Sequence, residues 1–225
     1  MKITLLTLFP AYFAGGVFEC SIIKKAIDKG IVEVECVDIR SFATGRHQVV
    51  DDRPYGGGPG MVMKAEPVVK AIRSVRGPDS HVIYLTPQGE TLRAEKSEQI
   101  AKAHSHIILL CGHYEGIDER AIELEVDEEL SIGDYVVTSG NVAALVVTES
   151  VVRFVPGVVG HPEGAIDDTF HTESGFEGPL YTRPQCFEGI EVPPVLLQGN
   201  HAEITRWRQE KGRIKQQRRK KVCTH

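Results

Sequence analysis

The stretch that most constrains the fold is a short apolar run, His106 to Leu110, which breaks into a polar turn bracketed by Gly112 and Gly116. The run predicts a buried strand, and Asp118 after the turn marks the start of a helix. Open α/β sheets hold small ligands where a strand ends in such a turn. A second turn of the same kind, residues 131–137, follows closely. The two turns together predict one ligand pocket built from loops.

The first half of the chain alternates between strand and helix patterns. Apolar or alternating runs predict strands at residues 3–9, 31–39, 81–85 and 106–110. Helical patterns lie between them, at residues 18–29, 67–75, 92–104 and from residue 118 onward. This alternation predicts an α/β fold with a mostly parallel sheet that is covered on both faces.

The second half of the chain changes in residue composition along its length. Residues 141–155 predict a helix that is apolar on nearly all sides, which needs burial on nearly all sides and suggests a subunit interface. After this helix the chain becomes rich in Gly, Pro and acidic residues. We therefore predict a first domain over residues 1–156, a linker over 157–176 and a small, mainly helical C-terminal domain over 177–225. An amphipathic helix is expected in the last of these, over residues 201–217.

The charge of the chain is unevenly distributed. The net charge is −5, yet residues 200–225 carry nine Lys or Arg against two Glu, a net +7, so the other 199 residues carry −12. A basic end of this kind is typical of proteins that bind a polyanion. A solvated helix end is the alternative that charge alone leaves open.

Nothing in the sequence predicts a membrane span or a secreted protein. No apolar run approaches the roughly 18 residues that a membrane helix needs. The N-terminal apolar stretch is short and ends at Pro10, which favours a buried strand over a signal peptide. The five cysteines are scattered without a CxxC pair, so we expect reduced thiols and a cytoplasmic protein.

Residues 51–61 form a second conspicuous segment, with four glycines and two prolines in eleven residues. No Gly-Lys-Ser/Thr follows, and the segment is not a GxGxxG turn, so the common nucleotide-binding motifs are excluded. A bare flexible loop is one interpretation. The other is a binding loop in which Arg53 and Tyr55 contact a phosphate and a base.

Three further features have both a structural and a functional interpretation. Residues 86–89 form a turn after a predicted strand, which turn chemistry alone also explains. Arg153 and Asp168 flank the predicted linker, where they are either an ion pair or part of an active site. The nine histidines show no HExxH spacing, and we predict no protein metal ligand among them.

Taken together and in this order, these segments resemble the bacterial tRNA (guanine-N1)-methyltransferases, a family of the trefoil-knotted SPOUT superfamily that modifies guanosine 37 beside the anticodon. The resemblance spans nearly the whole chain. The matching stretches are residues 8–10, 51–61, 87–89, 110–120, 131–137, 153–160, 168–170, 181–184 and 192–207.

The resemblance implies a trefoil knot at the C-terminal end of the first domain and S-adenosylmethionine bound within it. It also implies a homodimer in which each active site is completed by the partner subunit. The cofactor-binding residues implied are Thr86, Pro87, Gly89, Gly112, His113, Tyr114, Glu115, Ser131, Ile132, Gly133, Tyr135, Val137, Ser139 and Gly140.

The same resemblance implies the catalytic and substrate-binding residues. Asp168 would take the proton from guanine N1, and Arg153 would stabilise the charge that develops at O6. The family also uses a divalent cation, usually Mg²⁺. The residues expected to contact tRNA are Asp51, Arg53, Tyr55, Gly58, Arg206 and Arg208.

The chain departs from the family pattern at a few positions. His113 stands where arginine is expected, and residues 138–141 read Thr-Ser-Gly-Asn in place of Ser-Gly-Gly-Glu. Asp167 stands where glutamate is usual. Two other functions stay open on the sequence. One is a knotted methyltransferase acting on another RNA position, and the other is a non-catalytic module that binds tRNA or the ribosome.

Overall fold

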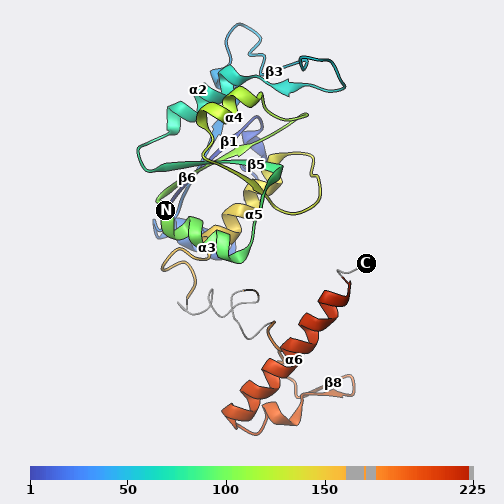
Figure 1. Ribbon diagram of the computed structural model, residues 1–225. Helices are drawn as coiled ribbons and strands as arrows, with labels where there is room; N and C mark the ends of the chain where they lie inside the picture. The colour runs from blue at the N-terminus through green and yellow to red at the C-terminus, as the bar shows by residue number, and fades with distance from the viewer. Residues whose placement is uncertain (161–169, 171–175, 223–225) are drawn as a thin grey trace. The chain divides into compact units, whose positions relative to one another are not determined.

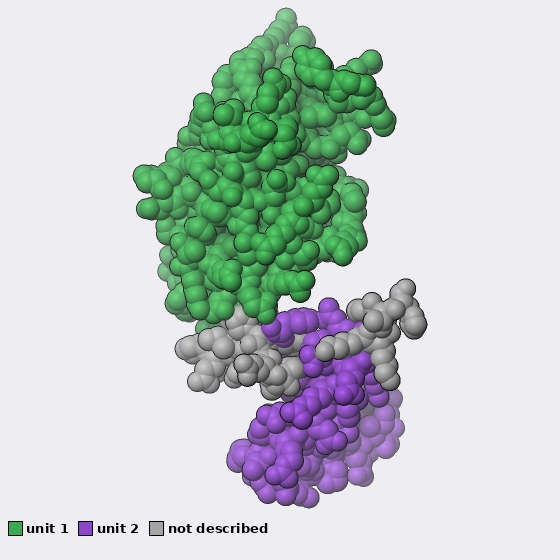
Figure 2. Space-filling model, viewed as in Figure 1, with its two compact units in different colours: residues 1–160 green, residues 161–225 purple. Residues whose placement is uncertain are grey.

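The computed structural model describes residues 1–160, 170 and 176–222, and it divides into two compact units, Met1–Gly160 and His161–His225 (Figures 1 and 2). The first unit holds the sheet and most of the helices, and the second holds a long helix and a short hairpin. In the described part of the chain, no helix combines the length and the apolar character needed to cross a membrane.

A five-stranded sheet forms the centre of the first unit, and every pairing within it is parallel. Its strand order is β2-β1-β6-β5-β7, so β6 is the central strand and β2 and β7 are the edges. The strands are β1 (Lys2–Thr7), β2 (Glu33–Asp38), β5 (Ser80–Thr91), β6 (His106–Cys111) and β7 (Glu128–Ser131). The predicted mostly parallel sheet is therefore confirmed.

Helices cover both faces of this sheet. They are α1 (Ser21–Asp28), α2 (Ala65–Val75), α3 (Ala94–Ala103), α4 (Glu119–Glu125) and α5 (Gly140–Val152), with short 3-10 turns η1 (Pro10–Tyr12) and η2 (Ile39–Phe42). Figure 1 shows α2 and α4 on one side of the sheet and α3 and α5 on the other.

The alternation of side chains along the strands explains these two layers, because successive residues point to opposite faces. Ile107 and Leu109 of β6 belong to the core beneath α1, α3 and α5, whereas Ile108 and Leu110 belong to the core beneath α2 and α4. All four side chains are fully buried. A strand that is apolar on both faces can only lie in the interior of such a sandwich.

The structure differs from the sequence prediction at two places near the loops. The turn expected at residues 86–89 lies inside one long strand, β5, as an irregularity where the pairing with β7 shifts between Leu85 and Glu90. The strand β7 was not predicted, because its Glu128-Glu129 start is acidic and its apolar part is short. Its pairing with β5 compensates for that weak local pattern.

The second unit contains the hairpin β8 (Cys186–Phe187) and β9 (Ile190–Glu191), the turn η4 (Pro194–Leu196) and the helix α6 (His201–Val222). Residues 176–178 run close along α6, because Gly178 lies against the backbone of Arg208 and Gly212 lies against the carbonyl of Phe176. The ring of Tyr181 lies 6.3 Å from the ring of Trp207. Glycine at 178 and 212 is what permits this close approach.

Candidate active site

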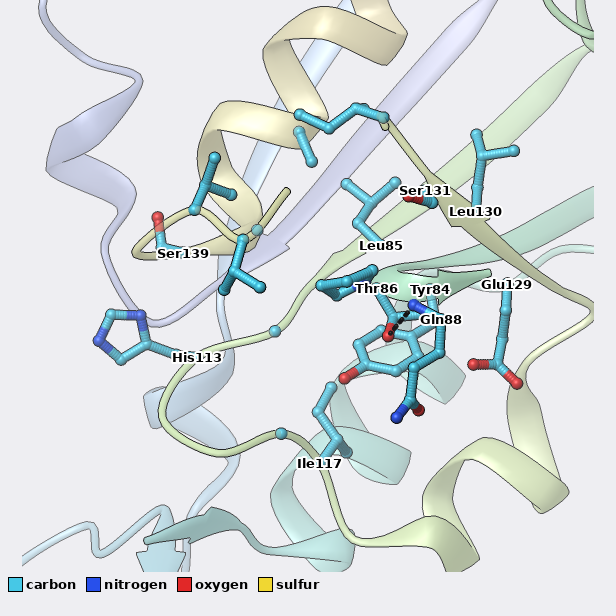
Figure 3. Close-up of a pocket in the computed structure, with 18 of the residues that line it drawn as sticks. Tyr84, Leu85, Thr86, Gln88, His113, Ile117, Glu129, Leu130, Ser131 and Ser139 are labelled. Carbon is cyan, nitrogen blue, oxygen red and sulfur yellow. Dashed lines mark hydrogen bonds between the residues drawn. The ribbon is translucent and has the colours of Figure 1, made fainter. Parts of the chain in front are cut away.

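A pocket of about 520 Å³ opens beside the irregular part of β5 and at the carboxyl ends of β6 and β7 (Figure 3). Its walls come from residues 84–88 of β5, from the loop between β6 and α4, and from the segment between β7 and α5. The carboxyl edge of a parallel sheet is where α/β proteins bind ligands, and the volume is in the range of small-molecule sites.

Most of the residues predicted to bind a cofactor line this one pocket. They are Thr86, Pro87, Gly112, His113, Tyr114, Glu115, Ser131, Ile132, Tyr135, Val137, Ser139 and Gly140. Gly89 and Gly133 do not line it. Gly89 instead lies against the backbone of Glu129 and Leu130, and Gly133 (φ +143°) lies against the ring of Tyr135. Both glycines therefore allow close packing within the loops without lining the pocket.

Two segments of the pocket wall touch through their backbones. The amide N–H of Gly140 donates to the carbonyl of Gly112 over 2.8 Å. A Cβ at position 140 would lie 2.7 Å from the amide nitrogen of Gly112 and 2.8 Å from the Cα of Cys111. Only glycine fits between these backbone atoms, so Gly140 is fixed by packing as well as by its place in the pocket.

Hydrogen bonds between residues close in sequence stabilise the loops that line the pocket. The amide of Gln88 donates to the hydroxyl of Thr86 over 3.3 Å. The Ser131 hydroxyl donates to the carbonyl of Gly133 and lies 3.2 Å from its amide. The Tyr135 hydroxyl donates to the carbonyl of Ile132. These side chains stabilise turns locally, which leaves backbone groups of the loops facing the pocket.

His113 occupies one end of the pocket, near Ser139 in Figure 3. Its ring lies 4.8 Å from the ring of Phe9 and 4.8 Å from the ring of Tyr114. Its Nδ1 atom is buried and has no hydrogen-bond partner among the described residues. Most buried polar atoms have a partner, so this unpaired nitrogen is an exception in the described part of the chain.

Tyr84 forms part of the pocket wall and was not among the predicted residues. Burial raises the pKa of its hydroxyl, although a hydrogen bond to Thr86 opposes the rise. The pocket also contains Gln88, Ile117, Glu119, Glu129 and Ala143, which the sequence reasoning missed. Glu119 and Ala143 lie inside predicted helices, where side chains were assigned to packing. Gln88 and Ile117 lie in or beside the predicted turns without matching a motif, and Glu129 lies in β7, which was not predicted.

The glycine-rich segment lies next to the pocket loop. Its stem is the two-stranded ladder of β3 (Asp51–Asp52) and β4 (Val62–Met63). The amide of Glu115 donates to the carbonyl of Met61, and the amide of Met63 donates to the carbonyl of Gly116. The segment is therefore attached to the pocket wall through its stem.

The predicted substrate-binding residues of this segment lie on its outer part. The side chain of Tyr55 is 99% exposed, and Arg53 and Gly58 are exposed beside it. Asp51 is half-buried in the stem. An aromatic ring this exposed contributes little to the core, which favours a binding role over a packing role.

The structure does not bring Arg153 to the pocket of its own chain. Arg153 follows the last residue of α5, whereas the pocket includes Gly140 and Ala143 at the start of that helix. The 13 residues of this helix separate its two ends by about 20 Å. Asp167 and Asp168 lie outside the described residues.

Two of the basic residues predicted to bind tRNA lie in the second unit. Arg206 and Arg208 are both exposed on α6, while Trp207 between them is half-buried. Lys211 lies over the Trp207 ring at 5.9 Å from its centre. Among the described residues, no group of three or more His, Cys, Asp or Glu could hold a metal ion.

Comparisons with known proteins agree on one family. The family model of the "tRNA (Guanine-1)-methyltransferase TrmD" matches residues 1–224. A Protochlamydia amoebophila protein named "tRNA (guanine-N(1)-)-methyltransferase" is 54% identical over 218 residues, which cover 96% of each chain. Proteins of the same name from Chlamydia pneumoniae and Chlamydia abortus are 57% and 54% identical over 211 residues, 93% of this chain. The match spans only 57% and 58% of the length of those two proteins.

Proposed function

Because the chain belongs to the tRNA (guanine-1)-methyltransferase family, we propose that it transfers a methyl group from S-adenosylmethionine to N1 of guanosine 37 in tRNA. The family match over residues 1–224 carries this proposal. The pocket at the carboxyl edge of the sheet supports it, since it gathers the three loops that the resemblance assigns to the methyl donor. The enzyme works in the cytoplasm, where its tRNA substrate is.

The pocket suits S-adenosylmethionine in shape and chemistry. Backbone amides and carbonyls of the three loops can pair with the edge of an adenine, and Leu85, Ile117 and Ala143 supply an apolar slot. When bound there, S-adenosylmethionine supplies the reactive methyl group on a sulfonium. The protein contributes position, because holding the methyl group in line with the acceptor nitrogen supplies much of the acceleration.

The acceptor nitrogen needs a base, since guanine N1 carries a proton. We assign this role to Asp168, whose carboxylate would take the proton as the methyl group arrives. Negative charge then develops toward O6 of the guanine. The Arg153 guanidinium stabilises that charge, and removal of a comparable electrostatic donor typically lowers the rate about a hundredfold to a thousandfold.

The chain topology proposed for this unit is the trefoil knot of the SPOUT superfamily. The close approach of Gly140 to Cys111 and Gly112 supports it, because the segment after β7 must pass directly against the end of β6. True knots are otherwise nearly absent from proteins. Passing the chain through its own loop would collect the three pocket loops in one small volume.

The active enzyme is proposed to be a homodimer in which two subunits share each site. The position of Arg153 supports this arrangement, because it lies about 20 Å along α5 from the pocket of its own chain. An arginine from the partner subunit can reach a pocket that its own chain's arginine does not. The apolar α5, with Val146 40% exposed, is consistent with a face that meets the second subunit.

Binding of tRNA is assigned to both units. Arg206 and Arg208 of α6 would contact phosphates, while Arg53 and Tyr55 of the glycine-rich segment would contact the target base or its neighbours. In this assignment residues 1–156 bind the methyl donor, residues 157–176 link the domains and residues 177–225 bind tRNA. Mg²⁺ is proposed as a requirement of the reaction, but the described residues offer no cluster of ligands for it, and no step above depends on it.

A methyl-transfer assay with labelled S-adenosylmethionine tests the proposal. Two tRNA transcripts that differ only in guanosine or adenosine at position 37 serve as substrates, and label is expected in the first alone. Label in both transcripts would move the target to another RNA position. Absence of label with retained tRNA binding would favour the non-catalytic binding module.

The role of Asp168 is tested in the same assay. Asp168→Asn is expected to lower turnover at least about a hundredfold while S-adenosylmethionine still binds, because the amide cannot accept the N1 proton. Asp79→Asn, an exposed position away from the pocket, is the matched control. Near-normal turnover in Asp168→Asn would contradict the assignment.

A further inference from the structure

Most of the acidic side chains between the end of β6 and the end of β7 fall into two groups. Four of them are paired with arginine or lysine side chains: Asp118, Glu125, Asp127 and Glu128. Three others line the pocket and have no ion-pair partner within the described residues: Glu115, Glu119 and Glu129. In this part of the chain, the carboxylates that are left unpaired therefore gather at the pocket.

The pocket has no cationic side chain of its own to balance these carboxylates. No lysine or arginine lines it within the described part of the chain, so with His113 neutral its side chains carry three negative charges. An arginine from a second subunit, as proposed above, would add one positive charge and leave the sum negative. The three carboxylates are not a metal-binding group of the described residues. A ligand that carries positive charge would therefore be attracted by the pocket as a whole rather than by coordination.

Two of the carboxylates act on the wall of the pocket where the loop after β6 runs. The Tyr84 hydroxyl lies against this loop, because a Cβ at Gly112 would be 3.2 Å from it and a Cβ at Gly116 would be 3.8 Å from it. Burial is the main cause of the raised pKa of Tyr84, and the charges of Glu129 and Glu119 raise it as well. Figure 3 shows the Glu129 side chain on the same side of the pocket as Tyr84. The negative charge is therefore present at a loop that the resemblance assigns to the methyl donor.

The methyl donor and its product differ by one positive charge. Transfer breaks the bond between the sulfonium sulfur and the methyl carbon, and the electron pair of that bond stays on the sulfur as a neutral thioether. The methyl carbon bonds guanine N1, whose proton passes to the base. The product, S-adenosylhomocysteine, therefore lacks the charge that a negative pocket attracts.

We propose that Glu119 and Glu129 are specificity-determining residues that make the pocket prefer the cationic methyl donor over its neutral product. This inference rests on the proposed function for the identity of the two ligands. Neither carboxylate needs to touch the sulfonium, because the interaction between two charges falls only with the inverse of their distance. The preference favours replacement of the product by a new donor after each transfer.

Calorimetry with the full chain tests the inference, in a buffer with EDTA so that no divalent cation contributes. The measured quantity is the dissociation constant of S-adenosylhomocysteine divided by that of S-adenosylmethionine, because contacts common to both ligands cancel in this ratio. Glu119→Gln combined with Glu129→Gln is expected to lower the ratio about threefold to tenfold, the size of a Coulombic effect across about 10 Å of mostly aqueous surroundings. The affinity for S-adenosylhomocysteine itself should stay nearly constant.

Two controls accompany the double variant. Glu123→Gln removes an exposed carboxylate of the same helix outside the pocket, and it is expected to leave the ratio unchanged. Sinefungin carries an ammonium group in place of the methylsulfonium, so its binding should weaken in the double variant as much as that of S-adenosylmethionine. Glu115 is left unchanged, because its side chain packs against Gly60 of the glycine-rich segment.

An unchanged ratio in the double variant, or an equal loss of affinity for both ligands, would overturn the inference. If the double variant does not fold, Glu119→Gln at its exposed position repeats the test, with an expected fall of about twofold to threefold. A wild-type chain that binds neither ligand would overturn the proposed function together with this inference. Binding of both ligands by the wild-type chain, with the same ratio in the variant, would overturn this inference alone.

Discussion

At the scale of single residues, the pocket depends on a glycine at a position where any side chain would collide with neighbouring backbone atoms. Gly140 lies between backbone atoms of Cys111 and Gly112, which cannot move independently of β6. Gly15, in contrast, has open space where a Cβ would be, and its backbone does not need a positive φ. A substitution at Gly15 therefore changes chain flexibility alone, whereas one at Gly140 also disturbs close packing.

Gly140→Ala is expected to lower the free energy of unfolding by about 1–3 kcal/mol, because the added methyl group forces the segments apart. It should also weaken S-adenosylmethionine binding, since both segments line the pocket. Gly15→Ala is the matched control and should leave binding unchanged. Chemical denaturation and calorimetry measure the two effects, and equal stability of the two variants would contradict the packing argument.

Two histidines near the start of β6, His104 and His106, make stability depend on pH. Burial lowers the pKa of His106, whose ring also bonds Thr4 and Ser80. Burial and the nearby His81 lower the pKa of His104, whose ring stacks on His81 at 4.0 Å. Both groups are therefore more easily protonated in the unfolded chain than in the folded one.

The sign of the pH effect follows from those lowered pKa values. Stability is fully present above the unfolded histidine pKa of about 6.5 and falls as the pH drops below it, since the unfolded state then binds more protons. His104→Gln is expected to reduce this fall, measured by urea unfolding at about pH 7.5 and about pH 5.5, on either side of that pKa. An unchanged difference between the two pH values would show that His104 does not contribute.

At the scale of elements, α6 combines packing and charge on different sides. Trp207 is half-buried while its neighbours Arg206 and Arg208 are exposed. Gly212 allows Phe176 to lie directly against the helix. This division predicts that the arginines can be changed without unfolding the second unit.

Arg206→Gln with Arg208→Gln is expected to weaken tRNA binding, because each arginine pairs with a phosphate and releases a counterion. The slope of log affinity against log salt should fall by about one for each phosphate that the variant no longer neutralises. Lys29→Gln, an exposed position of the first unit, is the control. Filter binding between low and moderate salt measures the slopes. A slope that stays constant in the double variant would place the phosphate-binding residues elsewhere.

At the scale of the whole molecule, the proposal that two subunits share each active site can be tested with dimers that combine two different variants. Ile132→Arg would block the pocket, and Asp168→Asn would remove the base. A heterodimer of the two variants holds one intact site if pocket and base come from different subunits. Mixed dimers formed from equal amounts should then regain roughly a quarter of the wild-type activity, by random pairing of two subunits.

Heterodimers carrying two different affinity tags allow this measurement, because sequential purification isolates them from either parent. Each parental homodimer is expected to be inactive under the same conditions. Purified heterodimers without activity would show that pocket and base come from the same chain.

The α/β class, the parallel sheet and two of the three pocket loops could be predicted from the order of residues alone, and the resemblance added the third loop, residues 86–89. An apolar run as short as 107–110, followed by a glycine-bracketed turn, favours a strand buried on both faces over a helix. Periodicity did not predict β7, whose acidic start is stabilised by pairing with β5, and it indicated a turn where β5 has an irregularity. The resemblance supplied the family, which the comparisons confirmed.

Which residues meet depended on the packing of distant elements. Thr7 and Asn141 are 134 positions apart in the chain, yet one hydroxyl joins them. Gly89 belongs with the pocket residues by sequence, although its place is against the backbone of β7. Only the fold places Arg153 at the far end of α5 from its own pocket. Local patterns record what each element needs to bury, whereas the distance between two side chains depends on how distant elements pack.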